Sequence, residues 1–317
     1  MTRDLRSALA SRVLVADGGM GTMLQGHDLT LADFQGLEGC NEVLNVSRPD
    51  VVASIHAAYL AAGADCVETN TFGANLSALA EYDAVHRIAE LAGAGARIAR
   101  QAADAAATPE RPRFVLGSMG PGTKLPSLGH TSYARLRDAY QEQAEAMVAG
   151  GVDGFQVETC QDLLQARAAV VGAQRACVAA GVALPVFVHV TVETSGTMLL
   201  GSEIGAALTA LEPLGIDAIG LNCGTGPTEM SEHLRHLSRH ARIPLVCMPN
   251  AGLPELTPDG ARYPMGPEEF VDHVGQYARE FGVGLVGGCC GTTPAHIARL
   301  AVAVAGRAPT PREPEHV

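Results

Sequence analysis

Three cysteines of this sequence have the neighbours and the spacing expected of a metal site. Cys289 and Cys290 are adjacent and flanked by glycines, and Cys223 stands between Asn222 and Gly224 in an earlier segment of the same character. Thiolates bind zinc well, and a site with three protein ligands leaves a fourth position open for a reacting molecule. Burial as small apolar side chains is the alternative, but two adjacent side chains rarely both point into a core. The trio predicts a zinc site built for reaction.

The charge of such a site indicates the kind of reaction. Three thiolates on one Zn²⁺ leave a net charge of −1, and a fourth thiol would lose its proton on binding because the metal lowers its pKa. The anionic site returns electron density to the bound thiolate, which therefore stays nucleophilic. Hydrolases usually use nitrogen and oxygen ligands, which leave zinc a stronger Lewis acid for water. The three cysteines therefore favour alkyl transfer to sulfur.

Carboxylates stand at the ends of three apolar runs. Asp17 begins the glycine-rich segment 17–22, whose backbone N–H groups could receive a carboxylate, although an ordinary turn with a capping Asp explains the segment equally well. Glu68 and Glu158 follow two further runs. Carboxylates are costly to bury unless a cation arrives. The hypothesis that follows is recognition of an amino acid, with side-chain carboxylates binding its ammonium group.

Two other patterns are excluded as sites. Residues 117–124 nearly match a phosphate-binding P-loop, but the order Thr123-Lys124 is reversed, so the motif fails. His233, His236 and His240 would share one helix face, but the arginines interleaved with them favour a solvated surface over a metal site.

The elements that must position these residues are short apolar runs, each followed by a turn and a helical pattern. Such runs are typical of strands buried on both faces, and the Ala/Leu-rich stretches between them, such as 51–62, 133–149 and 267–281, predict covering helices. Eight alternations predict an α/β fold of the (β/α)8 TIM-barrel type, since a doubly wound open sheet would more naturally use five to seven strands. The eight runs are residues 13–16, 65–68, 113–116, 154–157, 186–190, 218–221, 245–248 and 284–287.

In such a barrel the loops after the strands form the active face. Long irregular insertions are expected there at residues 25–48, 119–131 and 251–266. We expect the barrel to occupy residues 1–306. Residues 307–317 are rich in proline and glutamate, which indicates a tail or the start of an interdomain linker.

Composition excludes several classes of partner. The chain has 317 residues and a net charge of −12 without a basic run, which argues against nucleic acid. No apolar run is long enough to predict a membrane span. The N-terminus does not have the pattern of a signal peptide, so the eight cysteines predict a reducing, cytoplasmic compartment.

Taken together, four segments closely resemble the homocysteine S-methyltransferase family over nearly the whole chain: residues 17–22, 68–72, 220–223 and 287–294. Within this family, residues 195–198 and 249–254 most resemble the N-terminal homocysteine-binding module of cobalamin-dependent methionine synthases. His130, Tyr133 and residues 159–164 are similar to the actinobacterial form of that module.

The resemblance implies a (β/α)8 barrel with one zinc ion on the three cysteines and the thiolate of L-homocysteine in the fourth position. It implies that Asp17 and Glu158 bind the substrate ammonium and that backbone near Gly18 and Thr71 binds its carboxylate. Asn222, beside the first zinc ligand, would occupy the open position before substrate arrives.

By the same resemblance, the expected activity is zinc-dependent formation of L-methionine. The methyl group would come from methylcobalamin on a separate domain or protein, with cobalamin-binding and folate-binding domains as partners. Two alternatives stay open. A stand-alone enzyme would use S-methylmethionine or betaine, cations that aromatic boxes usually bind; the chain has no Trp and 4% aromatic residues, although Tyr59, Tyr82 and Tyr133 remain. A homocysteine-binding module would be inactive without a corrinoid partner.

Overall fold

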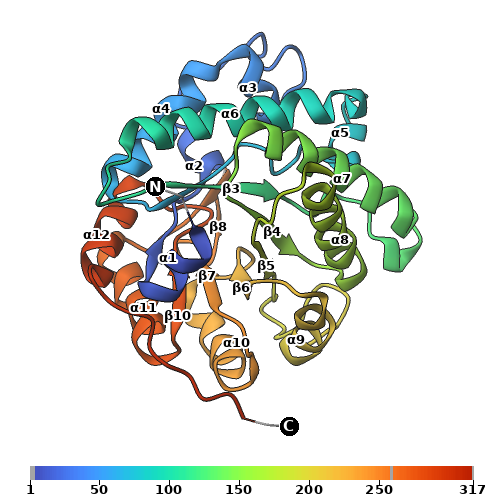
Figure 1. Ribbon diagram of the computed structural model, residues 1–317. Coiled ribbons are helices and arrows are strands. Elements are labelled where there is room, and N and C mark those ends of the chain that lie inside the picture. Colours follow the sequence, from blue (N-terminus) through green and yellow to red (C-terminus); the bar gives the residue numbers. More distant parts are fainter. Residues whose placement is uncertain (1–3, 258–259, 316–317) are drawn as a thin grey trace.

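Eight parallel strands form the predicted TIM barrel in a computed structural model that describes residues 4–257 and 260–315 (Figure 1). The strand order is β1-β10-β7-β6-β5-β4-β3-β2, and a parallel bridge between Ala16 and Cys66 joins β1 to β2 and closes the barrel. The barrel strands are β1 Leu14–Val15, β2 Cys66–Glu68, β3 Phe114–Met119, β4 Gly154–Cys160, β5 Val186–Val190, β6 Ala218–Asn222, β7 Leu245–Met248 and β10 Val283–Val286. Each of the eight apolar runs therefore contains or overlaps a strand.

Helices surround the strands, as Figure 1 shows. The stretches predicted as covering helices lie in α4, α7 and α11. Proline is the first residue of α4, α10, α11 and α12. At this position a backbone N–H has no partner within the helix, so the missing N–H of proline costs no hydrogen bond. The helices are α1 Leu5–Ser11, α2 Met20–Leu24, α3 Leu44–Ser47, α4 Pro49–Ala62, α5 Leu76–Ala80, α6 Ile88–Ala106, α7 Tyr133–Gly150, α8 Leu163–Ala180, α9 Ile204–Leu211, α10 Pro227–His240, α11 Pro267–Glu280 and α12 Pro294–Val304, with the short 3₁₀ turns η1 Asn41–Val43, η2 Val85–Arg87, η3 Pro126–Leu128 and η4 Glu212–Leu214.

The apolar runs have no polar face because both faces of each strand are buried. In β5, Phe187 belongs to the cluster inside the barrel, whereas Val186 and Val188 belong to the cluster between the strands and the helices. At one end of the barrel α1 covers the opening, and its Leu5 and Leu9 join the inner cluster. The carboxyl termini of the strands lie at the opposite end of the barrel, together with the loops that carry the predicted site residues.

The three long loops contain more structure than expected. The expectation of an irregular segment at 251–266 is wrong in part, because β8 Glu255–Thr257 and β9 Gly260–Arg262 pair there as an antiparallel hairpin. These strands are almost wholly exposed, so their sequences show no apolar alternation to indicate them. The loop at 25–48 contains η1 and α3, and the loop at 119–131 contains η3.

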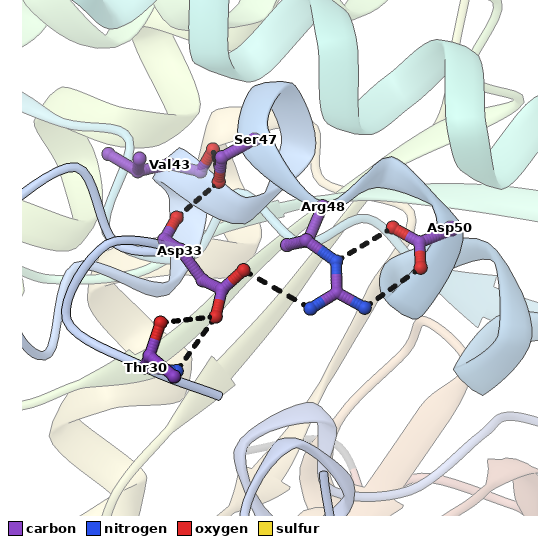
Figure 2. A network of polar contacts seen from close by, with 6 residues as sticks. All are labelled: Thr30, Asp33, Val43, Ser47, Arg48 and Asp50. Carbon is purple, nitrogen blue, oxygen red and sulfur yellow. Dashed lines mark hydrogen bonds and ion pairs between the residues drawn. The ribbon is translucent and has the colours of Figure 1, made fainter. Parts of the chain in front are cut away.

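Figure 2 shows the polar network that fixes the first long loop. Arg48 donates to both carboxylate oxygens of Asp50 at 3.0 and 2.9 Å and to Asp33 at 3.2 Å. The hydroxyl of Ser47 donates to the backbone oxygen of Asp33, and Thr30 donates to its carboxylate. The network ties the loop to the start of α4 and thereby holds the loop against the active face.

The proline-rich tail lies against the barrel over its described length. The Arg312 guanidinium donates to the backbone oxygens of Ala241 and Ile243, just beyond α10, and the Thr310 hydroxyl donates to that of Ala278 in α11. That residues 307–317 form a separate tail or linker stays a prediction. Within the described residues, no helix is long and apolar enough to cross a membrane.

Candidate metal and substrate site

A cavity of about 530 Å³ opens at the carboxyl ends of the strands. It brings together six of the eight predicted site residues, which come from the end of β4 and from the loops after β1, β6 and β10: Asp17, Gly18, Glu158, Cys223, Cys289 and Cys290. Thr71 and Asn222 are buried behind its wall, with 0% and 1% of their surface exposed. The loop after β2 and the segment after β9 complete the lining with Phe72 and Tyr263.

The three cysteine sulfurs are spaced as a tetrahedral metal site requires. The Cys290 sulfur lies 3.9 Å from that of Cys223 and 4.0 Å from that of Cys289. Zinc–sulfur bonds of about 2.3 Å at tetrahedral angles place sulfurs about 3.8 Å apart, so the trio fits zinc with little movement. Among the described residues these three form the one group of cysteine, histidine and carboxylate side chains spaced to hold a metal ion.

The backbone after β7 holds the adjacent cysteines in place. The N–H of Cys289 donates to the oxygen of Pro249 at 2.8 Å, and the N–H of Cys290 donates to the side-chain oxygen of Asn250 at 3.1 Å. The oxygen of Cys290 accepts from the N–H of Ala251 at 2.9 Å. Residues 249–254, which carry part of the family resemblance in the sequence, thus have a physical role, because they hold the loop that bears two of the three sulfurs.

A helix begins directly after the loop of the adjacent cysteines. Thr293 is the N-cap residue and Pro294 the first residue of α12. The N–H of Thr293 donates to Nδ1 of His296 at 3.2 Å. The positive end of the α12 dipole therefore lies just after the two cysteines, where it stabilises negative charge. Hydrogen bonds from Cys223 and Cys289 hold the pKa of the Cys290 thiol well below its ordinary value.

Carboxylates form the second part of the site. Asp17 accepts the N–H of Glu68 at 3.0 Å. Glu158 accepts the Ser118 hydroxyl at 2.5 Å and the Asn222 amide at 2.9 Å. Burial raises the pKa of all three carboxyl groups, that of Glu158 to about 7, and the Glu158 charge adds to the effect on Asp17 and Glu68. Among the described residues that line the cavity there is no lysine or arginine to compensate them.

Two oxygens of this cluster have open hydrogen-bonding capacity. Oδ1 of Asp17 and Oε1 of Glu68 are buried without a hydrogen-bond partner. Buried acceptors are almost always paired in native proteins, and an unpaired one costs roughly 1–3 kcal/mol. A ligand ammonium group, with three donors and a positive charge, would satisfy both oxygens. The carboxylate cluster therefore has the chemistry of an ammonium site.

Asn222 joins the carboxylates to the cysteines. Its amide nitrogen donates to Glu158 and to the Thr159 hydroxyl, and its oxygen accepts the Thr159 N–H at 2.7 Å. Thr159 has a φ of +55°, which is rare for a β-branched residue, and so does Cys223, which follows Asn222. Occupation of the open metal position by Asn222 stays a prediction, since the amide here bonds to Glu158 and Thr159.

The predicted carboxylate-binding backbone lies in two places. Gly18 lines the cavity, whereas Thr71 does not. The Thr71 N–H donates to the oxygen of Thr69 at 2.8 Å, and its hydroxyl donates to the oxygen of Ser118 at 2.7 Å. Its backbone donor is therefore already used, and its part in binding a ligand stays a prediction.

Sequence reasoning missed several residues of the site. Ser118 stands two positions beyond the third predicted strand, in the segment excluded as a failed P-loop; its place after a strand end was the available signal. Glu42 lines the cavity and accepts the Gly73 N–H at 2.7 Å. Asn250 and Tyr263 also belong to the site. Glu42 and Tyr263 lie in long loops, where no periodic pattern could single them out.

Comparison with known proteins agrees with this geometry. The family model described as homocysteine S-methyltransferase matches residues 14–304. The methionine synthase of Mycobacterium tuberculosis (strain ATCC 25618 / H37Rv) is 65% identical over 302 residues, which are 95% of this chain and 25% of that protein. The methionine synthase of Mycobacterium leprae (strain TN) is 62% identical over 316 residues, 99% of this chain and 26% of that protein. The chain thus spans about a quarter of the length of these curated relatives.

A solved structure shows the same fold. The metallated form of the homocysteine methyltransferase MmuM from Escherichia coli superposes with a TM-score of 0.72 at 24% identity, covering 95% of this chain and 99% of that chain. Its apo form superposes with a TM-score of 0.70.

Proposed function

This chain belongs to the homocysteine S-methyltransferase family, and from that premise we propose that its barrel transfers a methyl group to the thiolate of L-homocysteine, giving L-methionine. The observation that carries the proposal is one cavity with two matched halves. One half holds three sulfurs at metal-binding distances, and the other holds buried carboxylates with open acceptor oxygens. An amino acid that ends in a thiol matches both halves.

The cysteine half would hold zinc through Cys223, Cys289 and Cys290. The bound ion would supply a Lewis acid that lowers the pKa of the substrate thiol while three anionic ligands keep the resulting thiolate nucleophilic. The chain's own contribution is preorganisation. The backbone after β7 fixes two sulfurs, and the positive φ of Cys223 aims the third.

The carboxylate half would orient the amino-acid end of the substrate. Asp17 and Glu158 would accept the ammonium group, with Ser118 and Asn222 holding Glu158 in position. The unpaired oxygen of Glu68 offers a further acceptor. Backbone near Gly18, and Thr71 as first inferred from the sequence, would bind the carboxylate. Orientation of this kind places the sulfur at the metal and lowers the entropic cost of the transfer.

We infer that the methyl donor is methylcobalamin carried by another domain or protein. Support comes from methionine synthases that match this chain over about a quarter of their own length; cobalamin-binding and folate-binding domains are the proposed partners. The alternative donors S-methylmethionine and betaine have less support. Tyr59, Tyr82 and Tyr133 do not line the cavity, whose described aromatic residues are Phe72 and Tyr263. A binding module without turnover is the second alternative. We propose a cytoplasmic location, because the three thiols must stay reduced.

The proposal is tested by X-ray absorption at the zinc edge with and without homocysteine. A rise from three to four sulfur neighbours supports thiolate binding, and an unchanged sulfur count contradicts it. A methyl-transfer assay with free methylcobalamin then separates enzyme from binding module. Methionine formed at comparable rates from S-methylmethionine or betaine would overturn the corrinoid assignment.

A further inference from the structure

Tyr263 lies directly against the cysteine loop. It follows β9 and packs on the backbone of Gly291, the residue after Cys290: a Cβ built at Gly291 would lie 2.2 Å from the Cβ of Tyr263. Gly291 has a φ of +79°, so a side chain at that position would also strain the backbone. Glycine at position 291 is therefore what allows the tyrosine to approach the metal site.

Tyr263 and the predicted metal ligand Cys290 line the same cavity, beside Cys223 and Cys289. The phenol and the Cys290 thiol are near enough for each to shift the pKa of the other. Two residues later, Met265 is anchored at both backbone atoms. Its N–H donates to the oxygen of Ala251 at 3.0 Å, and its oxygen lies 3.0 Å from Nε2 of His296. These bonds hold the Tyr263 segment to the backbone that fixes the cysteines.

The negative charge of the metal site explains why a hydrogen-bond donor is needed beside it. Three thiolates and a substrate thiolate around a divalent ion carry a net charge of −2, and no lysine or arginine stands among the described residues that line the cavity. Neutral hydrogen-bond donors must therefore disperse the negative charge. The phenol of half-buried Tyr263 is such a donor, and hydrogen bonds donated to an anion are stronger than those between neutral groups.

We propose that Tyr263 is a positioning residue of the metal centre, whose phenol donates a hydrogen bond to the Cys290 thiolate and so strengthens the hold of the cysteines on a metal ion and on a fourth thiolate. The part that concerns the fourth thiolate rests on the proposed function, whereas the part that concerns the metal ion does not. Loss of a hydrogen-bonding partner of a metal ligand typically weakens metal binding roughly 10- to 100-fold.

The test compares Tyr263→Phe with wild type in the whole chain. Tyr263→Phe keeps the ring and its packing on Gly291 and removes only the hydroxyl. Tyr133→Phe is the matched control, because it makes the same change at the start of α7, outside the cavity lining. Tyr263→Ala removes ring and hydroxyl together, and so separates packing from hydrogen bonding.

Two readouts do not depend on methyl transfer. In competition with a chelator, Tyr263→Phe should bind zinc roughly 10-fold or more weakly than wild type and Tyr133→Phe. In the cobalt(II)-substituted protein, the sulfur-to-metal charge-transfer band should move to lower energy, because a thiolate without the hydrogen bond holds its electrons less tightly. An unchanged affinity together with an unmoved band would overturn the proposal, and so would a loss confined to Tyr263→Ala.

A homocysteine titration of the cobalt(II) proteins separates this inference from the proposed function. The expected result is a spectral change in wild type with a dissociation constant roughly 10-fold higher in Tyr263→Phe. If wild type shows no response to homocysteine, the proposed function fails, while the zinc competition still decides the role of Tyr263. If both proteins respond with equal affinity, the part of the inference about the fourth thiolate is overturned and the proposed function stands.

Discussion

Replacing Glu158 by glutamine tests whether the buried carboxylates bind a substrate ammonium group. Glu158 accepts hydrogen bonds from the Ser118 hydroxyl at 2.5 Å and the Asn222 amide at 2.9 Å. Glutamine has the same shape. It can turn its oxygen to Asn222 and its amide to Ser118, whose hydroxyl also accepts hydrogen bonds. The variant should therefore stay folded and keep its metal site while it loses one negative charge.

The expected loss of homocysteine affinity follows from the one hydrogen bond to the substrate that the substitution weakens. A hydrogen bond to a charged group contributes roughly 1.5–3 kcal/mol, so homocysteine affinity should fall roughly 10- to 100-fold. Isothermal titration calorimetry measures this with two ligands, homocysteine and 4-mercaptobutyrate. The second has the thiol and the carboxylate without the amino group. Glu158→Gln should weaken the first and leave the second unchanged. Equal losses for both ligands would refute the assignment of Glu158 to the ammonium group.

The same variant should be more stable than wild type at alkaline pH when no ligand is bound. Burial raises the pKa of Glu158 from 4.5 to about 7. A carboxyl group whose folded pKa lies above its unfolded value favours the folded state at acidic pH, and this contribution is lost as pH rises through 7. The difference between the folded and unfolded pKa corresponds to about 3 kcal/mol in the free energy of unfolding. Urea unfolding of metal-free protein at pH 5 and pH 8 should show a much larger gain at pH 8 than at pH 5; the same difference at both pH values would contradict the reasoning.

Three further substitutions test other parts of the structure. Cys289→Ala should abolish zinc binding, measured by metal analysis, and leave the circular dichroism spectrum intact; unfolding at room temperature would instead make the metal structural. Asn222→Ala breaks three side-chain hydrogen bonds and should lower the free energy of unfolding by about 3 kcal/mol in urea, at about 1 kcal/mol each. Arg312→Ala removes donors to the carbonyls of Ala241 and Ile243 and should cost about 2 kcal/mol; an unchanged urea midpoint would show that the Arg312 bonds contribute no stability.

The barrel could be predicted from the sequence because its strands are buried on both faces. Burial of this kind produces mainly apolar runs such as 186–190, and the sequence contains eight of them. The cysteines could be placed together for a related reason. Parallel strands of a barrel end at the same face, so residues just after β6 and β10 must be near one another whatever their separation in sequence.

The rest of the site depends on contacts that leave no pattern. The hairpin of β8 and β9 is exposed, so its residues do not alternate. Tyr263 packs against the cysteine loop only because position 291 is a glycine in the left-handed region. Such an approach is set by the three-dimensional path of two loops, which local sequence does not encode.

Backbone strain at the ends of β4 and β6 links the halves of the site. Thr159 and Cys223 both have a φ of +55°, and a left-handed conformation costs roughly 1–2 kcal/mol for a non-glycine residue. Strain of this kind persists only where surrounding bonds enforce it. The Asn222 oxygen accepts the Thr159 N–H at 2.7 Å, and the Cys223 oxygen accepts the Thr225 N–H at 2.7 Å. Because the same Asn222 amide holds Glu158, a shift of the ammonium site must also move the backbone that places the Cys223 sulfur.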